Sequence, residues 1–146
     1  MVVRWDVLTL SDGRDVGCWG HKVFENDDAQ DWVAQMLEDG DSESTQRVLE
    51  KIPGATYPDA SDCAMALAAA EVVAAARHRP STNLPEEIHA WLLEHHLSAN
   101  ESLTTFARKV VTSIKAHSEL RDLWKDSDDD FRKWNDVLDD LSDRLS

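Results

Sequence analysis

The feature that most constrains the fold is an alanine-rich apolar stretch from Cys63 to Ala76. It lies between Pro58, which suits the start of a helix, and Pro80, which a helix cannot continue through. A helix of this composition is apolar on nearly all sides, and such a helix is normally surrounded by protein. The stretch therefore predicts a central helix, and its small alanine side chains allow neighbouring helices to approach closely.

The chain from Gly17 onward shows helical spacing throughout. Apolar residues recur three and four positions apart in separate segments, as in the series Phe131, Trp134, Leu138 and Leu141. Most segments begin at a residue that favours a helix start: Asn26 or Asp27, Pro58, Pro85, Asn100, Ser118 and Asp128. A further short helix is predicted from about Glu43. The predicted fold is an all-α, single-domain bundle of about six or seven helices around a buried, alanine-rich third helix.

Residues 1–16 do not share this pattern. Val3, Trp5 and Val7 alternate with polar residues, which is typical of a strand, but no second strand is predicted to pair with them. A chain of 146 residues is the usual size of one domain. We therefore predict a loosely attached extension at residues 1–16 and one helical domain at residues 17–146.

The charge of the chain restricts its partners. Fifteen Lys and Arg residues stand against twenty-nine Asp and Glu residues, which gives a formal net charge of −14. This charge repels nucleic acids and anionic membrane surfaces, so a macromolecular partner is expected to be a basic protein. No signal peptide or membrane span is predicted, and the two cysteines form no disulfide framework, which predicts a cytoplasmic location.

Glu71 stands out because it interrupts the apolar helix, four residues after Leu67. A buried carboxylate needs hydrogen bonds or a counter-charge. We predict that it accepts hydrogen bonds from residues 17–26, where glycines leave backbone N–H groups available, with Arg77 or His78 as alternative donors. In the last helix, the four-residue spacing of Asp140 and Arg144 predicts an ion pair on a solvated face.

Residues 17–32 carry a recognisable motif. It reads Gly17-Cys18-Trp19-Gly20, three residues, Phe24-Glu25-Asn26-Asp27, and then Ala29-Gln30-Asp31-Trp32. With the segments 66–73 and 119–124, this motif resembles the bacterial domain-of-unknown-function family 4259 over roughly residues 17–145. The resemblance supports the helical fold and implies no activity.

The candidate site residues come from this motif and the apolar helix: Trp19, Gly20, Phe24, Glu25, Asn26, Asp27, Asp31, Trp32 and Glu71. In a structural interpretation, the aromatic residues close one end of the core and Asn26 with Asp27 caps a helix. In a functional interpretation, Glu25, Asp27, Asp31 and Glu71 converge around a divalent metal.

No cofactor or metal site is predicted from spacing alone. Cys18 and His21 lack a second pair of zinc ligands, and the acidic run at residues 126–130 has Phe131 where a calcium loop requires glycine. The leading hypothesis is a non-enzymatic interaction domain, such as an immunity protein that binds a basic toxin. A small carboxylate-based, metal-dependent enzyme and a structural protein without a fixed partner are the alternatives.

Overall fold

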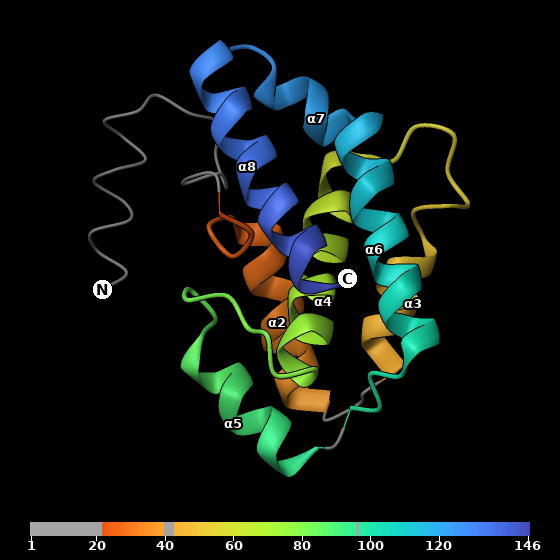
Figure 1. Cartoon of the computed structure of the whole chain (residues 1–146), viewed down its shortest axis with the longest axis vertical. Helices are drawn as coiled ribbons and strands as arrows, with labels where there is room; N and C mark the ends of the chain where they lie inside the picture. Colours follow the sequence, from red (N-terminus) through yellow and green to blue (C-terminus); the bar gives the residue numbers. More distant parts are fainter. Residues whose placement is uncertain (1–21, 40–42, 96) are drawn as a thin grey trace.

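The computed structural model describes residues 22–39, 43–95 and 97–146, so the predicted extension lies outside the described residues. Within these ranges the chain is all-α and contains no strand, as predicted. None of these helices is long and apolar enough to cross a membrane. Seven helices are described (Figure 1): α2 (Asp27–Asp39), α3 (Glu43–Glu50), α4 (Ala60–Ala76), α5 (Glu86–Glu94), α6 (Glu101–Ala116), α7 (Glu119–Trp124) and α8 (Asp128–Arg144).

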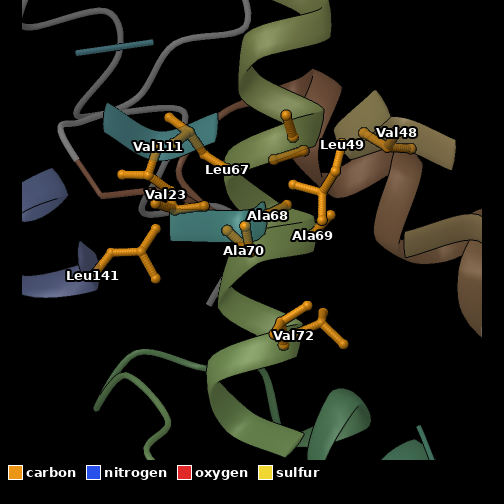
Figure 2. Close-up of a cluster of buried hydrophobic side chains, with 14 of the residues drawn as sticks. Val23, Val48, Leu49, Leu67, Ala68, Ala69, Ala70, Val72, Val111 and Leu141 are labelled. Atoms are coloured by element: carbon orange, nitrogen blue, oxygen red, sulfur yellow. The ribbon is translucent and has the colours of Figure 1, made fainter. Parts of the chain in front are cut away.

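Helix α4 is the centre of the bundle. Every residue from Ala66 to Ala75 is buried, and each of the other described helices contacts α4. Figure 2 shows Leu141 on one side of this helix and Val48 with Leu49 on the other. Alanine makes this possible, because its small side chain lets helices on several sides approach the same backbone. The central, alanine-rich helix of the sequence prediction is α4.

Side-chain caps begin most of the helices. The Asn100 carboxamide oxygen accepts a hydrogen bond from the Leu103 N–H at 2.8 Å, and the Ser118 hydroxyl accepts one from the Arg121 N–H at 3.0 Å. Each such cap contributes about 1 kcal/mol by satisfying a backbone donor of the first turn. Both caps were predicted. Helix α8 is capped by Ser127, the residue before the predicted start.

The start of α4 is tied to the start of α7. The Ala60 N–H donates to the Glu119 carboxylate at 2.7 Å, while the Glu119 N–H donates to the Pro58 carbonyl at 3.0 Å. Cys63, in the first turn of α4, is buried, and this burial raises the pKa of its thiol to about 12. A thiol that stays protonated in this way is a small core side chain and a poor nucleophile.

Helix α4 ends in a Schellman motif, two residues before Pro80. The Arg79 N–H donates to the Ala74 carbonyl at 3.0 Å and the His78 N–H donates to the Ala75 carbonyl at 2.9 Å. This geometry places His78 at a φ of 68°. Glycine is the usual residue at this position, because a β-carbon there crowds the backbone.

Replacing His78 with glycine should therefore raise the free energy of unfolding by about 0.5–1 kcal/mol. His89, which is exposed within α5, provides the matched control, because glycine in a helix interior costs about 1 kcal/mol. Urea denaturation of the two variants should thus give shifts of opposite sign. A loss of stability in His78→Gly would show that the imidazole makes a contact worth more than the strain.

Candidate functional site

The candidate site is built on an ion pair between Glu71 of α4 and Arg144 of α8. The Glu71 side chain is only 2 % exposed, so the predicted burial is confirmed. Arg144 Nη1 lies 2.8 Å from Glu71 Oε1, and Arg144 Nη2 lies 2.9 Å from Glu71 Oε2. Two parallel, charge-assisted hydrogen bonds of this kind hold both side chains in one orientation.

Among the described residues, the hydrogen-bond donors of Glu71 are not the predicted ones. Residues 22–26, the described part of the predicted donor segment, give it no hydrogen bond, because the Glu25 and Lys22 N–H groups are used within their own turn. The alternative donor Arg77 points elsewhere and donates to the Ala99 carbonyl at 3.3 Å. The counter-charge of Glu71 is instead Arg144, which lies 73 residues later in the sequence.

Arg144 has two further partners. Its Nε donates to the Asp140 carboxylate at 2.9 Å, and Nη1 also donates to the Arg79 carbonyl at 3.3 Å. Burial alone lowers the pKa of the Arg144 guanidinium, but the hydrogen bonds and charges of Glu71 and Asp140 outweigh it and raise that pKa above its ordinary value.

The surface role predicted for Arg144 also needs correction. Its pairing with Asp140 is present, but the Arg144 side chain is only 13 % exposed and is directed at Glu71. Arg144 follows the core residue Leu141 by three positions, which places it beside the apolar stripe of α8. The spacing from Leu141, rather than from Asp140, was the signal for its burial.

A cavity of about 380 Å³ adjoins this ion pair. Its walls come from the turn before α2, from the loop between α4 and α5, and from one face of α8. Glu71 and Phe24 were predicted as site residues, whereas the other lining residues were not: Lys22, Val23, Pro80, Ser81, Thr82, Asn83, Asp136, Val137, Asp140 and Arg144. These residues come from distant parts of the sequence, so no local pattern marked them as neighbours.

The Phe-Glu-Asn-Asp motif has a structural role. Asn26 caps α2, because its side-chain oxygen accepts from the Ala29 N–H at 2.8 Å and its amide donates to the Val23 carbonyl at 3.1 Å. Phe24 and Trp32 are buried in the core, as the structural interpretation predicted. Trp19 and Gly20 lie outside the described residues.

Replacing Asn26 with alanine should lower the free energy of unfolding by about 1 kcal/mol, since the cap of α2 is lost. Asn26→Asp keeps the cap oxygen but loses the donor to Val23, and we expect its stability to lie between the wild type and Asn26→Ala. Thermal denaturation measures this order. Equal stability of the alanine variant and the wild type would contradict the assigned capping role.

The remaining carboxylates of the motif do not converge with Glu71. Asp27 and Asp31 are exposed on α2, and neither they nor the half-buried Glu25 line the cavity. In the part of the chain that the structure describes, no group of three or more His, Cys, Asp or Glu side chains is placed to hold a metal ion. The four-carboxylate metal site considered from sequence is therefore not assembled.

Asp27 and Asp31 instead belong to one of two neighbouring acidic helices. Helices α2 and α5 contact each other at one end of the bundle and contain no Lys or Arg (Figure 1). Leu93 of α5 is 81 % exposed beside Glu94. We name the exposed carboxylates of both helices the α2–α5 acidic surface: Asp27, Asp28, Asp31, Glu38, Asp39, Glu86, Glu87 and Glu94.

Comparison with known proteins places the chain in a family. No curated protein and no solved structure matches it. A family model described as Domain of unknown function (DUF4259) matches residues 17–137, the region that contains the Phe-Glu-Asn-Asp cap, all of α4 and the first part of α8. The chain therefore belongs to the DUF4259 family.

Proposed function

We propose that this protein is a non-enzymatic interaction domain that binds a basic protein through the α2–α5 acidic surface. The observation that carries the proposal is the absence of compensating charge there. Among the described residues, no ion pair involves any of its carboxylates, and the one side-chain hydrogen bond to them runs from the Ser61 hydroxyl to Asp28 at 3.1 Å. Complementary charge accelerates association and selects a partner of opposite sign.

Carboxylates of another acidic helix have cationic partners, in contrast to those of the α2–α5 acidic surface. Helix α8 is also acidic, but its Asp129 is paired with Lys133 at 3.1 Å and its Asp139 with Lys115 at 2.5 Å. On α2, Glu38 and Asp39 lie at the C-terminal end, where the helix dipole disfavours negative charge by about 0.3–1 kcal/mol each. A stability cost that no internal contact offsets is typical of a functional surface.

Leu93 adds an apolar anchor to the same surface. Its side chain is almost fully exposed, although burying a leucine contributes about 1.5–3 kcal/mol. An apolar contact surrounded by charge complementarity is the usual organisation of an interface. A stoichiometric binder such as an immunity protein fits these features. We further propose that it acts in the bacterial cytoplasm, where a free thiol such as Cys63 stays reduced.

The test compares variants of the acidic surface. Asp31→Asn, Glu38→Gln and Glu87→Gln together remove three charges from α2 and α5 without touching the core. The wild-type chain, immobilised and incubated with lysate of its own host, should retain a basic protein, which is then purified for calorimetry. We expect the triple variant to bind this protein at least about tenfold more weakly, and added salt to weaken the wild-type complex.

The matched control removes three exposed charges elsewhere: Glu50→Gln, Asp126→Asn and Asp143→Asn. This variant has the same net charge as the triple variant of the acidic surface, so a general charge effect would weaken both equally. Full binding by the control and loss by the surface variant support the proposal. Equal binding by the two variants, a partner that is not basic, or no partner after chemical cross-linking would overturn it.

A further inference from the structure

We propose that the cavity beside the Glu71–Arg144 pair binds a small zwitterion, namely an apolar amino acid or a short peptide of such residues. This inference is independent of the protein-binding function, because none of the residues of the α2–α5 acidic surface lines the cavity. It rests on the charges that the cavity presents, on its apolar lining and on its size.

Three of the charged side chains that line the cavity are neutralised by one another. Glu71, Arg144 and Asp140 satisfy one another through hydrogen bonds of 2.8–2.9 Å. The lining contains two further charged side chains, Lys22 and Asp136. Neither forms an ion pair with any described residue, and the Lys22 ammonium has a single hydrogen bond, to the Asn83 side-chain oxygen at 3.4 Å.

Lys22 and Asp136 lie on different walls of the cavity. Lys22 precedes α2 and contacts the loop between α4 and α5, whereas Asp136 belongs to α8. Both residues line the cavity and are exposed, and no ion pair joins them. A ligand with a carboxylate and an ammonium satisfies both, and such charge-assisted hydrogen bonds are among the strongest polar contacts.

The size and the apolar lining of the cavity suit a small, partly apolar molecule. A volume of about 380 Å³ lies at the lower end of the range for small-molecule sites, which suits an amino acid or dipeptide. Val23, Phe24, Pro80 and Val137 supply apolar lining, so an apolar side chain is preferred. The Glu71–Arg144 pair holds α8 against α4 and keeps the walls in a fixed relation, which lowers the cost of binding.

The experiment uses the full chain with L-leucine, L-phenylalanine and leucyl-leucine as probes. A probe present at ten times its Kd should raise Tm by about 4 °C in a chain of this size. N-acetyl-leucine lacks the ammonium and leucine amide lacks the carboxylate, so both should bind more weakly than leucine. Charge-assisted hydrogen bonds predict a difference of about tenfold to a hundredfold in Kd.

Variants of Lys22 and Asp136 test whether these two charges bind the probe. Asp136→Asn and Lys22→Met should each weaken binding of the best probe by about tenfold or more, measured by calorimetry. Asp143→Asn on α8 and Lys109→Met on α6 change the same residue types at exposed positions outside the lining, and they should bind as the wild type does. The folding of every variant is checked by its Tm without ligand.

Several outcomes would overturn the inference. Unchanged Tm with all three probes at concentrations up to their solubility limits would show that the cavity takes no such ligand. Equal binding of N-acetyl-leucine and leucine would indicate a site for a simple anion, and equal binding of leucine amide a site for a simple cation. Full binding by Asp136→Asn or Lys22→Met would place the ligand outside the cavity.

Discussion

Replacing Arg144 with methionine should lower the free energy of unfolding by about 3–5 kcal/mol, because the Glu71 carboxylate then stays buried without a counter-charge. Methionine approximates the aliphatic part of arginine, so lost packing contributes little of this change. Urea denaturation followed by circular dichroism measures the loss. A variant that is unfolded in the absence of urea would satisfy the same expectation, since the loss then exceeds the total stability.

Two further variants test whether the unpaired charge of Glu71 causes the loss of stability in Arg144→Met. Asp140→Asn alters the exposed partner of Arg144 and should cost less than about 1 kcal/mol. The double variant Glu71→Met with Arg144→Met removes both buried charges, and we expect it to recover most of the lost stability. A single Arg144→Met variant as stable as Asp140→Asn, or a double variant no more stable than the single one, would contradict the assigned role of the pair.

Replacing Ala69 with leucine should lower the free energy of unfolding by about 1–3 kcal/mol, because the added atoms force apart helices that meet at the backbone of α4. Ala69 is fully buried, and in Figure 2 it lies beside Leu49 of α3. Thermal and urea denaturation should both show the loss.

Ala76→Leu is the matched control for this prediction. Ala76 is the last residue of the same helix and is half-buried, so the same added volume can extend toward solvent. We expect a change within about 0.5 kcal/mol. Equal losses at the two positions would mean that the leucine acts through helix propensity or the denatured state, and that α4 is not tightly packed at its centre.

Much of the fold could be predicted because its signals are local. The spacing of apolar residues and the caps Asn26, Asn100 and Ser118 act within one or two helical turns, and their positions are correct. Composition alone identified α4 as the central helix, since an apolar helix of that kind must be covered.

The candidate site could be predicted only in part, because its contacts are long-range. The burial of Glu71 followed from its position in α4, but its partner Arg144 lies 73 residues away. The local rule that pairs residues four apart correctly joined Arg144 to Asp140, yet that rule carries no information about the side from which the core approaches. Lys22, Asn83 and Asp136 share a cavity only because the tertiary fold brings three segments together.

The separation of Glu71 and Arg144 also affects synthesis of the protein. A ribosome releases the chain from its N-terminal side, so α4 emerges while Arg144 is still untranslated. Until that residue leaves the ribosome, packing α4 in its native position would bury an uncompensated negative charge. The bundle is therefore expected to close only after Arg144 has left the ribosome, so nascent chains and prematurely terminated products remain open to chaperones and proteases.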